Sequence, residues 1–385
     1  LPTTTQSAHH PHEILTPVRM HTRTARAVIC VSAFMFMELD IRLTSAGLAN
    51  GNPVDPHVCP KPGSVVLSFV AGYGSLSTPT KAYSKDDITP DDAWQRMHAQ
   101  FIRSLKSVLL HSDANITLIV YTNSFGMDII QSHVIDKFHP RVQARLKYIP
   151  IVLDPNVVQV YITRMGFAWD PRWAISKIFA YDSLPPCVEW AIQIDTDVIM
   201  VGDIKNLWSL RHSFNSTQLL GGVPETAYST RNMIKLQNKK IFVPSSIGFN
   251  SGVLIMNLKR MRDVNFGEDL LLEANKKLYP EWNNPNKIDP AKFHQLDQDV
   301  FNTVLTAYPS MRFQLPFRWN VQGCARYTQV QKLYIEAAPG IYHFNCNRRQ
   351  IDDWTSVKNS MSFVDSVEIS SPLLVGISHA STGTI

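Results

Sequence analysis

Two carboxylates, Asp195 and Asp197, stand between two apolar runs, and this arrangement constrains the fold more than any other feature. The runs, 191–194 and 198–201, each favour a buried strand. Carboxylates at positions i and i+2 of a strand end point to the same side, and they repel each other unless a cation lies between them. Their oxygens suit Mg²⁺ or Mn²⁺ shared with substrate phosphates. The pattern predicts a strand that ends on a metal site; a capped turn beside a solvated carboxylate is the alternative.

Strand-like and helix-like segments alternate over residues 63–203. Such alternation predicts an α/β fold with a mainly parallel sheet and helices on both faces, in which ligands bind at the carboxyl ends of the strands. The glycine-rich signatures of dinucleotide-binding and P-loop proteins are absent from the sequence. We expect strands at 64–72, 116–121, 142–153, 191–195 and 248–257, and helices at 91–110, 128–138, 173–181 and from 294.

Composition limits the classes of partner. Of the 385 residues, 44% are hydrophobic and 18% are charged, which is typical of a globular protein. The net charge of +5 comes from 37 basic and 32 acidic residues without a basic block, so we expect no nucleic-acid partner. After position 40 the sequence contains no apolar stretch long enough to span a bilayer.

The two ends of the chain differ from its middle. An apolar run at 27–37 follows three arginines and resembles a secretory signal or a truncated signal anchor, and an ordinary buried helix is the alternative. We interpret 1–62 as leader, anchor and stem, 63–354 as the folded domain, and 355–385 as a low-complexity tail that is frayed. The predicted location is the lumen of the Golgi or endoplasmic reticulum, either free or as a single-pass type II membrane protein.

Sequons and cysteines also indicate in which compartment the protein is located. Asn115-Ile116-Thr117 and Asn215-Ser216-Thr217 are acceptor sequences for glycosylation in a lumen. The five cysteines lack the spacing of a metal site. Cys324 and Cys346 flank the last motif region, and we hypothesise that they pair in an oxidising compartment.

Four motifs in order resemble glycosyltransferase family 8 over roughly residues 63–354. They are 194–198 with 202–204, 249–253, 297–299 and 342–343. Within the family, the segments 207–210, 214–218, 224–225 and 261–262 resemble the glucoside α-1,3-xylosyltransferases. The segments 318–320 with Cys324, and 345–347, resemble the xyloside α-1,3-xylosyltransferases.

The resemblance implies a GT-A fold and a retaining transfer from a UDP-sugar with Mn²⁺. It implies that Asp195, Asp197 and His343 hold the metal, and that Asp297, Gln298 and Asn250 lie at the reacting centre. For the donor it implies contacts from Val70, Ala71, Tyr73, Lys177, Asp195, Thr196, Asp197, Asn250, Ser251, Arg348 and Arg349. The sequence departs from the family after His343: Phe344-Asn345 replaces the usual glycine, and arginines stand near the position of the usual lysine.

Three functions compete. The first is transfer of xylose to a glycan or glycoprotein acceptor. The second is transfer from UDP-glucose or UDP-galactose to another glycan, a lipid or a polyol, because one hydroxymethyl group changes discrimination by only about 1–3 kcal/mol. The third is a catalytically retired lectin-like or scaffold protein, which the intact set of carboxylates argues against. A calcium-binding protein is not supported, because no further run of oxygen ligands follows Asp197.

Overall fold

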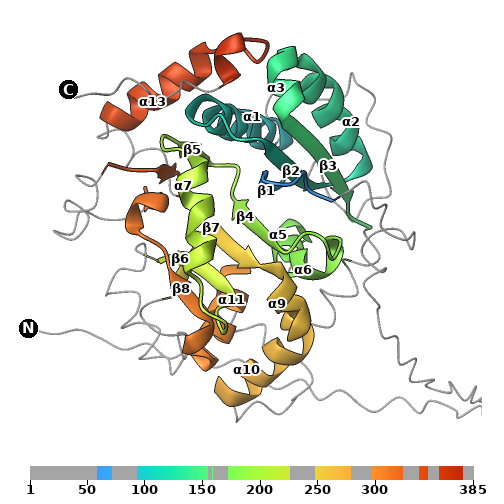
Figure 1. Ribbon diagram of the computed structural model, residues 1–385, viewed down its shortest axis with the longest axis vertical. Helices are drawn as coiled ribbons and strands as arrows, with labels where there is room; N and C mark the ends of the chain where they lie inside the picture. The colour runs from blue at the N-terminus through green and yellow to red at the C-terminus, as the bar shows by residue number, and fades with distance from the viewer. Residues whose placement is uncertain are drawn as a thin grey trace, which may run out of the picture. The chain divides into compact units, whose positions relative to one another are not determined.

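The computed structural model describes residues 59–71, 93–154, 158, 172–225, 248–278, 297–323, 338–345 and 355–375. All of them fall in one compact unit, which spans 43–385. Figure 1 shows a central sheet, running from β3 through β1 and β4 to β8, with helices packed on both of its faces.

Within the described residues, seven strands form the central sheet in the order β3-β2-β1-β4-β7-β6-β8. Strand β7 is antiparallel to its neighbours β4 and β6, and the other pairings are parallel. The prediction of a mainly parallel α/β sheet is confirmed. The strands are β1 (Val65–Val70), β2 (Ile116–Thr122), β3 (Leu146–Val152), β4 (Trp190–Ile194), β6 (Leu220–Pro224), β7 (Phe249–Asn257) and β8 (Arg312–Gln314).

A smaller sheet lies beside the end of β4. It has the order β5-β10-β9, with β10 antiparallel to β5 and parallel to β9. The three strands are β5 (Val198–Met200), β9 (Val321–Gln322) and β10 (Ile341–His343). Because β5 follows β4 after a three-residue turn, this sheet joins the last part of the chain to the carboxyl end of β4.

Alternate side chains of the long central strands enter two separate cores. In β1, Val65, Leu67 and Phe69 enter one core and Val66 enters the other. The first core also contains side chains of α1 (Ala93–His111), α2 (Ser124–His133), α3 (Pro140–Arg145), α7 (Ile204–Ser209) and α13 (Thr355–Ser366). The second contains side chains of α5 (Arg172–Ile178), α6 (Ala180–Ser183), α9 (Leu258–Asp263), α10 (Leu271–Leu278) and α11 (Asp297–Ala307). Burial on both faces explains why the strands are continuously apolar rather than alternating.

Short helical turns complete the described elements. They are η2 (Ile135–Lys137), η3 (Leu210–Ser213), η4 (Phe266–Leu270), η6 (Pro309–Met311), η7 (Phe317–Trp319) and η9 (Pro372–Val375).

The predicted strand at 142–153 is wrong in its first part, because residues 142–145 belong to helix α3. Pro140 starts this helix, and the His139 side chain accepts a hydrogen bond from the backbone N–H of Arg141 at 3.2 Å. Arg145 is buried at the other end, and its guanidinium donates to the carbonyls of Ser112 and Leu109. Capping by His139 and Pro140 therefore favours a helix here, although the apolar pattern of the segment predicts a strand.

The predicted frayed tail is wrong for residues 355–375. Helix α13 packs against α1, and the side chains of Val364, Val367 and Leu374 enter the first core. The Asp365 carboxylate accepts two hydrogen bonds from the Arg103 guanidinium, at 2.7 and 2.9 Å. The sequence of this segment is mostly polar, and its apolar residues form only a narrow stripe along one side of helix α13. The helix was therefore not predicted from composition. The boundaries 62 and 354 themselves stay predictions.

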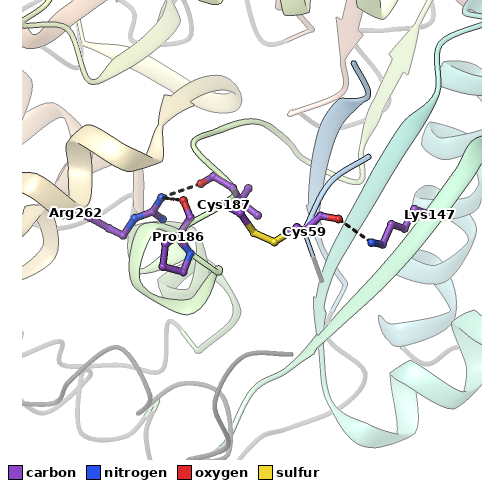
Figure 2. The surroundings of a disulfide bond; sticks show 6 residues. Cys59, Lys147, Pro186, Cys187 and Arg262 are labelled. Atoms are coloured by element: carbon purple, nitrogen blue, oxygen red, sulfur yellow. Dashed lines mark hydrogen bonds between the residues drawn. A yellow bond between two sulfur atoms is a disulfide. The ribbon is translucent and has the colours of Figure 1, made fainter. Parts of the chain in front are cut away.

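A disulfide joins Cys59, just before β1, to Cys187, just before β4 (Figure 2). The flanking backbone is held on both sides: Lys147 donates to the Cys59 carbonyl at 2.7 Å, and Arg262 of α9 donates to the carbonyls of Pro186 and Val188. Cys324 and Cys346 lie outside the described residues, so their pairing stays a hypothesis. The observed bond ties the segment that precedes the fold to the centre of the sheet.

We expect Cys187→Ser to lower the free energy of unfolding by about 2–5 kcal/mol, because the bond closes a loop between residues 128 positions apart. Denaturant melts of Cys59→Ser, Cys187→Ser and the double variant provide the measurement. The three variants should be equally destabilised, since either substitution removes the whole bond. Additive losses would mean that the two sulfurs are not bonded to each other.

Candidate active site

The turn that carries Asp195, Thr196 and Asp197 is fixed through its backbone. The Asp195 N–H donates to the Gly252 carbonyl of β7 at 2.9 Å, and the Phe344 N–H donates to the Asp197 carbonyl at 2.9 Å. Asp195 therefore continues the pairing of β4 with β7, and Asp197 continues the pairing of β5 with β10. Both side chains are partly exposed, at 28% and 26%.

Strand β10 brings His343 to the same turn, because its register places His343 opposite Val198. The imidazole is 3% exposed, and its Nε2 lies 3.3 Å from Asp197 Oδ1 and 3.7 Å from Asp195 Oδ2. One ligand atom from each of the three side chains lies within 4.8 Å of the others. Two carboxylate oxygens and one imidazole nitrogen are ligands that suit Mn²⁺. This cluster could hold a metal ion.

The His343 ring packs directly over Gly252. A Cβ at this position would lie 2.1 Å from His343 Cε1 and 2.6 Å from Nδ1, so only glycine leaves room for the ring. The glycine after Asn250 and Ser251 is thus required by the imidazole, not by a backbone turn.

We expect Gly252→Ala to displace the His343 ring and to weaken Mn²⁺ binding by at least about tenfold. Titration calorimetry with Mn²⁺ in the presence of UDP measures this. Gly221→Ala is the matched control, since its Cβ would lie 2.6 Å from Phe214 and would strain the core without touching the cluster. Equal Mn²⁺ affinities of the two variants would contradict the role given to Gly252.

Lys177 of α5 joins the cluster to helix α11. Its Nζ lies 2.5 Å from Asp195 Oδ1 and 2.9 Å from Asp297 Oδ2, and the Lys177 and Asp297 side chains are only 8% and 9% exposed. Burial lowers the pKa of the Lys177 ammonium, but the two carboxylates overcome this effect and hold its pKa above the usual value. One cation therefore balances two carboxylates.

The groups of the cluster shift one another's pKa in opposite directions. Burial raises the pKa of Asp195, with a further increase from the Asp197 charge. Burial also disfavours ionisation of Asp197, but the hydrogen bond and charge of His343 hold its pKa below the usual value. The pKa of His343 is raised, because Asp197 and Asp195 outweigh the effect of burial. The pocket thus stabilises positive charge between its carboxylates, as a cation site requires.

Behind the cluster, Glu225 connects two of the predicted side chains. Its Oε2 accepts from Asn250 Nδ2 at 2.8 Å and from Gln298 Nε2 at 2.9 Å. Gln298 Oε1 in turn accepts from the Ser251 N–H at 3.1 Å. Helix α11 and strand β7 are therefore held together by polar side chains that line one wall of the site.

Comparison with known proteins relates part of the chain to a family. The model of the family described as "Glycosyl transferase family 8" matches residues 173–349, which include the cluster, Lys177 and the β7 and α11 motifs. Residues 173–349 of this chain are therefore similar to glycosyltransferase family 8. The predicted resemblance to this family is confirmed over these residues.

Curated proteins similar to this chain include the xylosyl- and glucuronyltransferase LARGE1 of Danio rerio, 26% identical over 64% of the chain and 30% of that protein. The human xylosyl- and glucuronyltransferase LARGE2 is 26% identical over 64% of the chain and 32% of its own length. The chain thus matches about a third of these relatives. The crystal structure of apo mouse xyloside xylosyltransferase 1 superposes with a TM-score of 0.53 at 17% identity, covering 74% of this chain and 98% of the mouse chain. The predicted GT-A fold is confirmed.

The structure brings most of the predicted site residues together at one end of the sheet. Ion pairs link Lys177, Asp195, Asp197, Asp297 and His343. Ser251 is hydrogen-bonded to Gln298, and Glu225 joins Gln298 to Asn250. Thr196 lies half-buried between the two aspartates. Tyr73, Arg348 and Arg349 lie outside the described residues and stay predictions.

Val70 ends strand β1, and Ala71 follows it. Strand β1 pairs in parallel with β4 through Leu67–Ile192 and Ser68–Gln193. Continuing this register places Val70 level with Asp195. The Ala71 side chain is fully buried in the first core, so a contact with a nucleotide would have to come from its backbone.

Three residues of the site were missed by the sequence analysis as functional residues: Glu225, Gly252 and Asn320. Glu225 directly follows β6, and a charged residue at a strand end was an available signal. Asn320 lies between η7 and β9 and is 1% exposed. Its role depends on contacts with residues 70 and 23 positions away, which local pattern does not reveal.

Proposed function

We propose that this chain is a Mn²⁺-dependent retaining glycosyltransferase that moves a sugar from a UDP-sugar to a glycan acceptor on protein. The sugar that we propose is xylose. The observation that carries the proposal is the cluster of Asp195, Asp197 and His343, whose ligand atoms converge at the carboxyl end of β4. In open α/β sheets this edge is where ligands bind. The similarity of residues 173–349 to glycosyltransferase family 8 supports this reaction class.

The donor set of the cluster fits the metal that the family implies. Asp195, Asp197 and His343 would hold it, and when bound it would neutralise charge on the departing diphosphate. The protein's own contribution is to hold the two carboxylates and the imidazole in place. Strands β5, β7 and β10 do this through the backbone contacts of the turn.

Asp297 would orient an acceptor hydroxyl. Lys177 keeps it paired at 2.9 Å, and its neighbour Gln298 is fixed by Ser251 and Glu225. We assign no covalent role to Asp297. In the mechanism we favour, the acceptor hydroxyl attacks the face of the sugar that UDP leaves, and a departing phosphate oxygen takes its proton. Asn250 and Ser251 would orient the sugar hydroxyls.

Glu225 bears on the identity of the donor sugar. The named relatives are xylosyl- and glucuronyltransferases, and the two sugars differ by the carboxylate on C5 of glucuronate. In this chain the wall formed by Asn250 and Gln298 already contains the Glu225 carboxylate. A second carboxylate there would be repelled. This favours xylose, a neutral sugar, over glucuronate.

We also propose that the protein works in the lumen of the secretory pathway. A disulfide such as Cys59–Cys187 persists in oxidising compartments. Asn115 and Asn215 of the two sequons are both exposed. In the part of the chain that the structure describes, the helices are too short or too polar to cross a membrane. The apolar run at 27–37 lies outside that part.

The test is UDP release from UDP-xylose, UDP-glucuronate, UDP-glucose and UDP-galactose, each with Mn²⁺ and with EDTA. We expect slow hydrolysis of UDP-xylose that EDTA abolishes. Faster turnover of a hexose donor would overturn the xylose assignment but not the transferase. Metal-dependent UDP binding without turnover of any donor, even with a glycan acceptor added, would favour the retired lectin-like protein.

A further inference from the structure

A buried asparagine contacts the side of the His343 ring that faces away from the carboxylates. Asn320 is 1% exposed, and its Oδ1 lies 3.0 Å from His343 Nδ1. The other ring nitrogen, Nε2, faces Asp195 and Asp197. A histidine can ligate a metal through Nε2 only when the proton of the neutral ring is on Nδ1, so the partner of Nδ1 matters.

Hydrogen bonds that begin at a backbone amide fix the orientation of the Asn320 amide. The Gly252 N–H donates to Asn250 Oδ1 at 3.0 Å, and a backbone N–H can only donate, so that atom is an oxygen. The same oxygen lies 2.8 Å from Asn320, which must therefore present its NH₂ group there. The opposite end of Asn250 agrees, since its Nδ2 donates to the Glu225 carboxylate.

With its NH₂ group directed at Asn250, Asn320 can present only its oxygen to His343. An oxygen accepts, so Nδ1 is the protonated nitrogen of the neutral ring and Nε2 carries the lone pair. The chain from Gly252 through Asn250 and Asn320 to His343 thus determines which ring nitrogen faces the carboxylates. Gly252 also packs against the His343 ring. The same residue therefore positions the ring directly and determines the tautomer of the ring through the amides of Asn250 and Asn320.

We infer that Asn320 is the positioning residue that holds His343 in its metal-binding tautomer and ring orientation; the inference rests on the proposed function. Asn320 itself touches neither metal nor substrate. Its contribution is an acceptor that makes Nε2 a better ligand, as partners of metal-binding histidines commonly do.

Titration of Mn²⁺ into the full chain in the presence of UDP, followed by calorimetry, tests this without turnover. Asn320→Ala removes the acceptor and should raise the Mn²⁺ dissociation constant about 10–100-fold. Asn320→Asp keeps an oxygen for Nδ1–H but loses the donor to Asn250, and its Mn²⁺ dissociation constant should stay within about threefold of wild type. Both variants should have a lower melting temperature, because both lose the hydrogen bond to Asn250.

Asn275→Ala is the control for lost packing, since Asn275 is a fully buried asparagine on α10, outside the site. It should lower the melting temperature and leave Mn²⁺ affinity unchanged. Wild-type affinity in Asn320→Ala, or equal losses in the Ala and Asp variants, would overturn the inference while the proposed function stands. Failure of the wild-type chain itself to bind Mn²⁺ with UDP would overturn both.

Discussion

We expect Asp197→Ala to abolish Mn²⁺-dependent UDP binding and to lower sugar transfer by roughly three orders of magnitude or more, because losing a metal contact would remove several kcal/mol of stabilisation from the departing diphosphate. The fold should survive. The Asp197 side chain is 26% exposed, and the contact that fixes the turn is its backbone carbonyl, which the substitution retains. UDP binding by calorimetry with and without Mn²⁺, and UDP release from the preferred donor, provide the two measurements.

Asp203→Ala is the matched control for this variant. Asp203 is a nearby aspartate that follows strand β5. Its side chain caps helix α7 by accepting from the Lys205 N–H at 2.9 Å, and it also accepts from Ser112 Oγ at 2.7 Å. Its loss should cost about 1 kcal/mol of stability and leave metal-dependent UDP binding intact. If Asp197→Ala bound UDP with undiminished Mn²⁺ dependence, the metal assignment would be wrong.

The sequence predicted the central strands well because they are buried on both faces. Strand β7 begins at Phe249 and ends at Asn257, within the predicted 248–257, and β4 ends one residue before Asp195. The failures occurred where local chemistry competed with the apolar pattern. His139 and Pro140 start a helix in a segment that reads as a strand, and α13 buries only one side of a polar sequence.

For the site, the ligand types were predictable but the network behind them was not. Asp195 and Asp197 could be predicted as ligands from their spacing, and His343 could be predicted from its resemblance to a family motif. Glu225 and Asn320 act through contacts with residues 25 and 70 positions away along the chain. These contacts form because β6, β7 and β9 lie close together in the folded protein. That arrangement cannot be predicted from the local pattern of a single sequence.

Lys177→Met should have the largest effect on stability. The substitution keeps the length of the side chain but leaves Asp195 and Asp297 without their shared cation. Removing one member of a buried ion pair typically costs about 3–5 kcal/mol. The Lys177 pKa is raised in the folded state, so its contribution is complete below the unfolded pKa of about 10.4 and is lost as pH rises through the folded pKa. At pH 7–8 the loss should therefore be measured in full.

The size of this loss should depend on the metal. A divalent cation bound at Asp195 replaces part of the missing charge, so Mn²⁺ with UDP should restore stability to Lys177→Met more than to wild type. Thermal melts in EDTA and in Mn²⁺ with UDP measure the difference. Lys106→Met is the control: Lys106 is also buried, but burial lowers its pKa, so removing that charge should be neutral or slightly stabilising. A Lys177→Met variant that melted like wild type in EDTA would show that the carboxylates do not depend on this lysine, and a loss that Mn²⁺ left unchanged would separate Lys177 from the metal site.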